Sequence, residues 1–197
     1  IPLQTIKING DYKYPPFEFL NKDRVFEGFN VDILNNIANE LGVKFNLVPT
    51  HWAKALENLK SGNCDAIQGM SLTHNRSKNF IFSIKYLTFF HSLFVLKNNE
   101  HVKSLDNLSN SKIAIQRSDV SHDLFLKTTS NSKSFYIVLV DNHESMLSEL
   151  FSGSVQAIIG NNLTIMYLAN NIKKNHLLKA IGNPLKVTEY GIAMKKN

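Results

Sequence analysis

Two similar segments of 17 residues lie 91 positions apart in this chain. Residues 53–69 read AKALENLKSGNCDAIQG and residues 144–160 read ESMLSELFSGSVQAIIG. Each copy is typical of a helix that ends at a glycine, Gly62 or Gly153, and is followed by a short apolar strand. The offset is far longer than the period of a solenoid, about 20–50 residues. The repetition therefore predicts two similar α/β lobes, and chance similarity between two helix–strand turns is the alternative.

Composition excludes several classes of protein. With 43% hydrophobic and 19% charged residues, the chain is globular rather than disordered. Its net charge of +6 comes from scattered side chains, whereas nucleic-acid-binding proteins gather such charge on one face, so we expect no nucleic-acid partner. The single cysteine, Cys64, precludes an internal disulfide. No apolar run approaches the roughly 18 residues of a membrane span, and the first residues lack a signal-peptide pattern, so any export signal is expected to be gone already.

Strand-like and helix-like runs alternate along both halves. In the first half the expected elements are, in order, a strand at 5–9, a helix at 29–42, a strand at 44–48, a helix at 52–60 and a strand at 65–70. The second half repeats the order, with strands at 112–116, 135–140 and 155–160, and helices from about 119, at 143–152 and from about 162. This order predicts, in each lobe, a mostly parallel sheet flanked by helices.

Ligands of open α/β folds bind beyond the carboxyl ends of the strands, so the loops there are the candidate site. Those loops are residues 11–17, 69–76, 116–121 and 160–162. Within the second loop, Ser71 and Thr73 can begin a helix, and Arg76 follows one turn later. A helix start and a guanidinium both place donors around an anion, which favours a carboxylate or phosphate; a surface ion pair is the alternative.

Motifs of catalysis and metal binding are absent from the sequence. It contains no G-x-G-x-x-G, no Walker-type loop and no H-E-x-x-H, and its seven histidines show no i,i+4 pair. Ser121, His122 and Asp123 are consecutive, and adjacent side chains point apart, so they cannot form a catalytic relay. We expect no catalytic residues, no metal and no cofactor.

Six motifs follow one another along essentially the whole chain: GDYKYPPFEF, GFNVDILNNIANELG, ALENLKSGNCDAIQGMSLTHNRSKNFIFSIKY, SLDNLSNSKIAIQ, SVQAIIGN and YGIAMKKN. In this order they resemble the family-3 periplasmic solute-binding proteins, the amino-acid-binding "Venus flytrap" class. The resemblance implies two α/β lobes of the periplasmic-binding-protein type II fold, which are joined by two crossing strands and close on a ligand. Applied to this chain, it implies lobe 1 at 1–85 plus 191–197, lobe 2 at 91–185, and hinge crossovers at 86–90 and 186–190.

The same resemblance implies which residues contact the ligand. Tyr14 and Trp52 resemble the aromatic residues that sandwich it, and Asp11 stands where the family often reads the ligand's side chain. Gly69 and Ser71 match positions whose backbone and hydroxyl hold the ligand, and Arg76 matches the arginine that pairs with an α-carboxylate.

Lobe 2 departs from the transport members of the family. Gln116 precedes the loop RSDVS, in which Ser118, Asp119 and Val120 stand where those members carry a glycine-threonine-threonine sequence. Asp119 in this loop places a negative charge near the expected carboxylate position, which opposes binding unless the side chain faces away. Asn161 replaces an aspartate that binds the ligand's ammonium, and an amide provides no charge pairing. A standard zwitterionic amino acid is therefore less certain as the ligand than an amino-acid-like molecule or a small carboxylate.

The run GNNLTIMYL resembles flytrap domains that are fused to histidine kinases and diguanylate cyclases. We therefore favour a sensor ectodomain of a membrane signalling protein, in the periplasm or on the extracellular face of a bacterial membrane. A free or lipid-anchored binding protein of an ABC amino-acid importer, with a permease as its partner, is the alternative. An enzyme resembling cyclic-acid dehydratases is a remote third reading, for which Glu18 and Glu189 are the only glutamates near the expected cleft or hinge, with no partner visible in the sequence.

Overall fold

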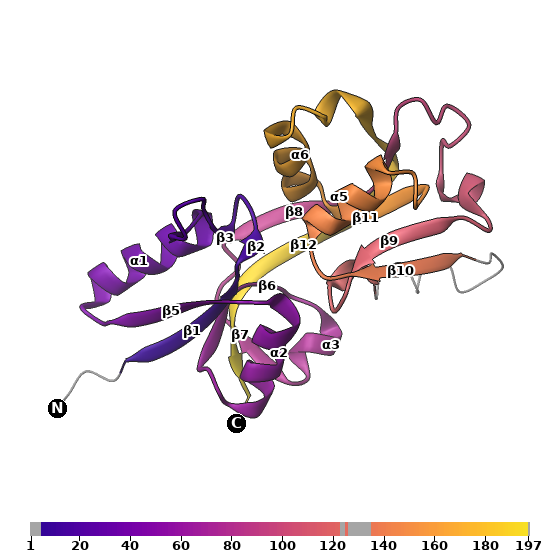
Figure 1. Ribbon diagram of the computed structural model, residues 1–197. Coiled ribbons are helices and arrows are strands. Elements are labelled where there is room, and N and C mark those ends of the chain that lie inside the picture. Colours follow the sequence, from indigo (N-terminus) through magenta and orange to yellow (C-terminus); the bar gives the residue numbers. More distant parts are fainter. Residues whose placement is uncertain (1–4, 123–124, 126–134, 197) are drawn as a thin grey trace. The chain divides into compact units, whose positions relative to one another are not determined.

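The computed structural model describes residues 5–122, 125 and 135–196 (Figure 1). Residues 123–124 and 126–134 are not among them, so most of the helix expected from about 119 lies outside the described residues. The chain divides into two compact units, residues 1–88 with 189–197 and residues 89–188. These are called unit 1 and unit 2 below, and each is described by itself. The expected hinge crossovers, 86–90 and 186–190, contain the two boundaries; their action as hinges stays a prediction.

Unit 1 is built on parallel strands. β1 (Ile6–Asp11) pairs in parallel with β5 (Phe45–Thr50) on one side and with β6 (Ala66–Ser71) on the other. The C-terminal part of β12 (Leu178–Lys195) runs antiparallel to β6 and also pairs with β7 (Phe80–Phe82). The carboxyl ends of β1 and β6 lie at the same edge of this sheet, and Asp11 and Ser71 are their last residues.

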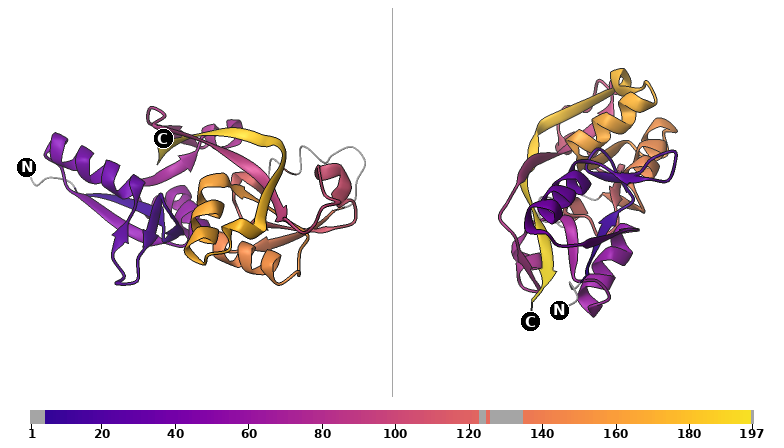
Figure 2. Two further views of the ribbon diagram at one scale, coloured as in Figure 1. Left: turned by 90° about the horizontal axis from the view of Figure 1, so that it is seen from above. Right: turned by 90° about the vertical axis from the view of Figure 1, so that its left-hand side faces the viewer.

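Two helices cover the opposite faces of this sheet (Figures 1 and 2). α1 (Phe29–Leu41) packs Leu34 against Ile8 and Ala66, whereas α2 (Trp52–Ser61) packs Ala55 and Leu59 against Ile67 and Met70. Successive residues of a strand point to opposite faces, so the neighbours Ala66 and Ile67 serve different cores. Both are fully buried, as the apolar run in the sequence predicts for a strand covered on both sides.

Short elements complete unit 1. A separate three-stranded antiparallel sheet consists of β2 (Lys13–Tyr14), β3 (Glu18–Leu20) and β4 (Phe26–Glu27). α3 (His74–Ser77) is a single turn that follows β6. The small sheet positions the residues that follow β1, including Tyr14 and Glu18.

Unit 2 repeats the same design. β9 (Lys112–Gln116) pairs in parallel with β10 (Tyr136–Val140) and with β11 (Ala157–Asn161), and β11 pairs antiparallel with β8 (Leu87–Leu96). α5 (His143–Phe151) and α6 (Asn162–Asn171) pack on one face, against Ala114 and Ile158. Ile113, Ile115, Ala157 and Ile159 point to the other face, where they pack with Leu108 of η1 (Leu105–Leu108). A second short helix, η2 (Asn175–Leu177), precedes β12.

Hydrogen bonding joins the large strands into one order, β10-β9-β11-β8-β12-β6-β1-β5, with β7 attached to β12. The sequence analysis expected a separate sheet in each half. That expectation did not include the full lengths of β8 and β12. Each of these strands has residues in unit 1 and in unit 2, so the strand order is continuous. The predicted fold class is confirmed: a two-unit α/β fold with mostly parallel strands flanked by helices.

The two copies of the repeated segment form the same local structure. In the first, α2 ends at Gly62 and β6 follows; in the second, α5 ends just before Gly153 and β11 follows. Both glycines adopt the left-handed conformation, with φ of 80° and 78°. A left-handed residue after the last turn satisfies the helix's terminal carbonyls and turns the chain back toward the sheet.

Gly153→Ala should destabilise the protein by about 1 kcal/mol, because a left-handed φ strains a residue that carries a Cβ. The added Cβ would have no atom within 4 Å, so backbone strain is the only cost. Gly153→Asn is the matched control and should lose less, since asparagine tolerates this conformation. Urea denaturation measures both; equal losses for the two variants would contradict the explanation.

Candidate functional site

Three predicted site residues of unit 1 lie at or near strand ends. Asp11 ends β1, is 5% exposed, and its Oδ1 accepts a hydrogen bond from the backbone N–H of Lys13 at 3.0 Å. Gly69 and Ser71 belong to the last half of β6, and both are buried. The neighbouring strands β1 and β6 thus place a carboxylate, a glycine backbone and a hydroxyl at one edge of a sheet.

Arg76 lies half-buried over this edge. Its Nη1 donates to the backbone oxygen of Ser71 at 3.2 Å, and its guanidinium carbon lies 5.4 Å from the ring centre of Trp52. The hydrogen bond to the carbonyl and the contact with the aromatic face hold the planar group in one orientation, and a guanidinium has the fork of donors that suits a carboxylate. Arg76 lies beside Ser71, and contact of either residue with a ligand stays a prediction.

The helix that begins after Thr73 differs from the expected anion receptor. Thr73 is its N-cap, with Oγ1 accepting from the backbone N–H of Arg76 at 3.1 Å, as its position predicts. α3 has only four residues, however, so aligned peptide dipoles contribute little. The guanidinium of Arg76 is therefore the candidate anion-binding group of this loop, and that role stays a prediction.

Two predicted aromatic contacts are packed inside unit 1. Trp52 is 7% exposed and belongs to the core cluster formed with Ala55, Leu59 and Met70. Tyr14 is also buried, with its ring 5.2 Å from that of Phe17 and 6.3 Å from that of Tyr190. The two prolines between Tyr14 and Phe17 thus belong to a turn that packs its aromatic rings together. Sandwiching of a ligand by Tyr14 and Trp52 stays a prediction.

A buried carboxyl group that the sequence analysis did not connect to the site lies directly behind it. Glu18 is 1% exposed; its Oε1 accepts from the backbone N–H of Asp11 at 2.6 Å and its Oε2 from Nδ2 of Asn30 at 2.8 Å. Asn30 in turn accepts from the hydroxyl of Tyr86 at 3.0 Å. Burial, with a smaller contribution from the charge of Asp11, raises the pKa of Glu18 to about 8. Glu18 therefore carries a proton at neutral pH.

This network explains the glycine at position 69. Gly69 has φ of +63°, and a Cβ there would lie 2.2 Å from Nδ2 of Asn30 and 3.2 Å from Oε2 of Glu18. The Glu18–Asn30 pair consequently packs against the backbone of a predicted ligand-binding residue.

Both glutamates that sequence reasoning left without partners have them. Glu18 has those just described, and Glu189 pairs with Lys85 at 2.5 Å on the surface of unit 1. Glu18 is too buried to reach a substrate, and the carboxyl of Glu189 is ion-paired with Lys85.

The predicted site residues of unit 2 lie at the carboxyl ends of β9 and β11. Gln116 ends β9, and its Nε2 donates to the backbone oxygen of Asp141 at 3.3 Å. Val120 is buried. Asn161 is the N-cap of α6, with Oδ1 accepting from the N–H groups of Leu163 at 2.8 Å and Thr164 at 3.4 Å. Capping is therefore one physical role of this amide; ligand contact by these three residues stays a prediction.

Asp119 faces into unit 2 rather than toward solvent. Its Oδ1 lies 3.6 Å from Nε2 of His91, and the hydroxyl of Ser121 donates to it. Nδ1 of His91 lies 3.0 Å from the hydroxyl of Thr188. Asp119 thus has polar partners within unit 2, and its effect on a carboxylate ligand stays a prediction.

Burial and neighbouring groups shift the pKa values of Asp119 and His143 in this cluster. Burial alone would raise the pKa of Asp119, but the hydrogen bond and charge of His91, followed by the charge of His143, hold that pKa well below its usual range. Burial lowers the pKa of His143 to about 4, with Asp119 opposing that shift and His91 adding to it. Near neutral pH, Asp119 is thus ionised and His143 is neutral.

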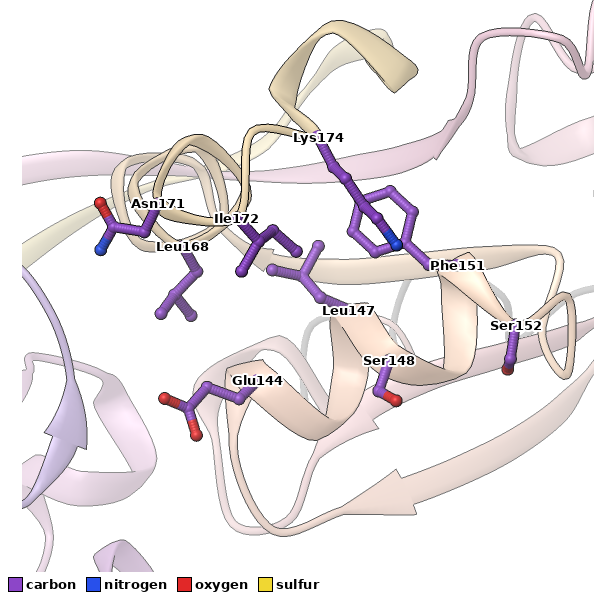
Figure 3. Close-up of a pocket in the computed structure, with 9 residues that line it drawn as sticks. All are labelled: Glu144, Leu147, Ser148, Phe151, Ser152, Leu168, Asn171, Ile172 and Lys174. Carbon is purple, nitrogen blue, oxygen red and sulfur yellow. The ribbon is translucent and has the colours of Figure 1, made fainter.

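A groove of about 610 Å³ lies between α5 and α6, away from these residues (Figure 3). Leu147, Leu168 and Ile172 face one another inside it, and Glu144 and Lys174 are polar residues of its wall. None of the nine predicted ligand contacts lines this groove.

The part of the chain that the structure describes has neither a metal-binding group nor a membrane-spanning helix. It contains no group of three or more His, Cys, Asp or Glu side chains placed to hold a metal ion. None of its helices has the length and apolar character needed to cross a membrane.

Comparison with known proteins defines the class. Residues 6–189 match the family model of bacterial extracellular solute-binding proteins, family 3, and the chain belongs to this family. It is similar to the L-cystine-binding protein TcyJ of Escherichia coli (strain K12), with 27% identity over 194 residues that cover 98% of this chain and 71% of the relative. A shorter match, 34% over 83 residues, covers 42% of this chain and 30% of the cyclohexadienyl dehydratase of Pseudomonas aeruginosa.

Solved structures show the same fold. An ancestral arginine-binding protein bound to arginine superposes with a TM-score of 0.89 at 28% identity, covering 99% of this chain and 86% of that one. A histidine kinase sensor domain with similarity to periplasmic binding proteins also has a TM-score of 0.89, covering 98% and 83%, at 23% identity. At that identity the second likeness concerns the fold alone. The family resemblance read from the sequence motifs is confirmed.

His143 should make the protein less stable as the pH falls from about 6.5 to 4, because its side chain takes up a proton in the unfolded chain but not in its buried site. The folded pKa of about 4 lies below the unfolded value of 6.5, so this contribution reaches about 3 kcal/mol over the window. Buried Glu18 has the opposite effect in this range, so the contribution of His143 is the difference between His143→Gln and the unsubstituted chain, whereas the control His74→Gln, at an exposed position, should match the unsubstituted chain. Urea denaturation at several pH values measures it; the same slope in His143→Gln and in the unsubstituted chain would refute the assignment.

Proposed function

We propose that this chain is an extracytoplasmic domain that binds an amino-acid-like or small carboxylate ligand. One observation carries the proposal: a half-buried Arg76, oriented by Ser71 and Trp52, lies at the sheet edge where Asp11 also ends a strand. A cation for a carboxylate and an anion for an ammonium or a cationic side chain are the two charges that recognise an amino acid. The similarity to TcyJ, an L-cystine-binding protein, and to the arginine-bound ancestral protein supports this ligand class.

The nine residues predicted from the family resemblance are the proposed ligand contacts. They are Asp11, Tyr14, Trp52, Gly69, Ser71 and Arg76 in unit 1, and Gln116, Val120 and Asn161 in unit 2. Contraction on ligand binding, as the resemblance implies, would appear as a smaller radius of gyration in solution scattering.

We infer that the domain acts as the sensor of a membrane signalling protein on the periplasmic or extracellular face of a bacterial membrane. The motif GNNLTIMYL and the amide at position 161 support this reading over delivery to a permease. The second candidate, a binding protein of an ABC amino-acid importer, is favoured by similarity to the putative ABC transporter arginine-binding protein 2 of Escherichia coli (strain K12). The parent gene distinguishes them: a stop codon soon after a final helix, with no membrane span encoded, would rule out the sensor.

A binding protein rather than an enzyme is the function that the geometry supports. Glu18 is buried inside unit 1 and Glu189 is ion-paired with Lys85, so neither carboxyl is placed to exchange a proton with a bound substrate. The dehydratase relative matches less than half of this chain. Absence of turnover of cyclic acids that bind would support this conclusion, and turnover would overturn it.

Arg76→Ala should weaken binding of a carboxylate-bearing amino acid by about 2–4 kcal/mol, because a charge-assisted pair is lost. Isothermal titration calorimetry measures the effect on a ligand identified by thermal-shift screening. Arg24→Ala is the control, since Arg24 is exposed in the turn before β4. Unchanged affinity of Arg76→Ala would refute the anion-binding role.

Ligand binding should also change the fluorescence of Trp52, the only tryptophan. The guanidinium over its ring would pair with the ligand's carboxylate, and the charge near the indole would change. Emission spectra during a titration test this. A flat signal at saturation would show that Trp52 is a core residue and senses nothing at the site.

A further inference from the structure

A groove of about 520 Å³ on unit 1 is lined almost entirely by lysine. It lies where the C-terminal ends of α2, α3 and β12 come together (Figure 1). The side chains around it are all exposed, come from three separate parts of the sequence, and include four ammonium groups and one amide. This lysine groove consists of Lys60, Lys78, Asn79, Lys195 and Lys196.

The backbone brings these three segments together. The N–H of Lys196, just after β12, donates to the backbone oxygen of Asn79, which follows the C-cap of α3, at 3.1 Å. Nζ of Lys195 lies 3.7 Å from the position that a Cβ on Gly62 would occupy, at the C-terminal end of α2. The fold therefore gathers into one groove positive charges that are scattered along the sequence.

No carboxylate of the described residues neutralises these ammonium groups. None lines the groove, and none of the four lysines forms an ion pair with any residue that the structure describes. The one acidic residue of α2, Glu57, pairs with Lys54 at 3.0 Å instead. Like charges that face one groove repel each other, and an anion that enters the groove relieves this repulsion.

The composition of the lysine groove indicates the kind of anion. Interfaces between proteins are enriched in aromatic residues and arginine and depleted in lysine, whereas this groove has no aromatic, aliphatic or arginine side chain. The bases of a single-stranded nucleic acid stack on aromatic side chains, and the groove offers none. Lysine acts as a point charge without a fixed geometry, which suits the phosphate groups in a fluid layer of lipid headgroups.

We propose that the lysine groove docks unit 1 on a membrane surface that contains anionic phospholipid. The inference rests on the proposed extracytoplasmic location beside a membrane and does not depend on the amino-acid ligand. None of the nine proposed ligand contacts lines the groove, so headgroups and ligand can bind at the same time. Each lysine near an anionic surface strengthens binding about fivefold, and four together strengthen it by up to several hundredfold.

Sedimentation with lipid vesicles tests the docking. The unsubstituted chain should sediment with vesicles of phosphatidylcholine mixed with phosphatidylglycerol, and stay in solution with vesicles of phosphatidylcholine alone. Binding should weaken sharply between about 0.05 M and about 0.3 M salt, because salt screens exposed charges. Absence of binding to the phosphatidylglycerol vesicles at the lower salt concentration would overturn the proposal.

Two fourfold variants separate the groove from the net charge of the chain. The groove variant carries Lys60→Gln, Lys78→Gln, Lys195→Gln and Lys196→Gln. The matched control carries glutamine at four other exposed lysines, Lys22, Lys44, Lys97 and Lys103. Each variant lowers the net charge from +6 to +2. The groove variant should bind the phosphatidylglycerol vesicles more than tenfold less tightly, and the control should keep most of the affinity. Equal losses in the two variants would show that net charge alone causes binding and would overturn the proposal.

Two further probes distinguish other anions. Poly-L-glutamate represents an acidic protein partner and inorganic phosphate represents a free anion, and calorimetry measures the binding of each. Binding of either probe by a chain that does not bind the vesicles would overturn the membrane proposal and identify the other class of anion.

Amino-acid binding is measured by thermal shift on the same preparations, so the two proposals fail separately. A groove variant that keeps its affinity for vesicles and for the amino acid would overturn the docking alone. A chain that sediments with the vesicles but binds no amino acid would overturn the proposed ligand class alone. Because all eight substituted lysines are exposed, both variants should fold, and their melting temperatures check this.

Discussion

Burial of both faces of a mostly parallel sheet is the constraint on which this structure depends. In each unit, neighbouring strand residues serve different cores, as Ala66 and Ile67 do in β6 and as Ala157 and Ile158 do in β11. These strands can be largely apolar only because helices or loops cover each side. Polar residues close several of the strands: Asp11, Ser71, Gln116 and Asn161 are the last residues of theirs.

Polar side chains that remain buried near these ends are accommodated differently in the two units. In unit 1, burial keeps Glu18 protonated, and the hydrogen-bond donors from Asn30 and Asp11, which favour the ionised form, offset only part of that effect. In unit 2, Asp119 stays ionised because His91 and Ser121 contact it. The difference is the presence of imidazole groups: a carboxylate with a potential cation at hand keeps its charge, and one without takes up a proton.

The sequence predicted the regular parts of this fold because their signals are local. The helix expected at 29–42 is α1 at 29–41, and the repeated segment is a helix, a left-handed glycine and a strand in both copies. The family resemblance implied crossing strands at 86–90 and 186–190, but the full lengths of β8 and β12 were not predicted, since each strand has residues in both units and no local pattern records that.

The site was predictable only in part for the same reason. Arg76 and Thr73 are close in sequence, so their relation could be read. The partner of His91 is Thr188, 97 residues away, and that of Glu18 is Asn30, which sits on a helix. Asn161 illustrates another limit: the residue that looks like a weakened ligand contact is also a helix cap, and sequence alone does not rank the two roles.

The two buried networks impose opposite pH dependences on one chain. His143 makes unit 2 less stable as pH falls from about 6.5 to 4, and Glu18 makes unit 1 less stable as pH rises from about 4.5 to 8, because each site resists the charged form. Both effects are a few kcal/mol, by the usual conversion of about 1.4 kcal/mol per pH unit. Between about 4.5 and 6.5 they offset each other if the units unfold together. At higher pH only the effect of Glu18 remains. The domain should lose stability toward about pH 8, because the unfolded chain releases the Glu18 proton that the folded chain retains.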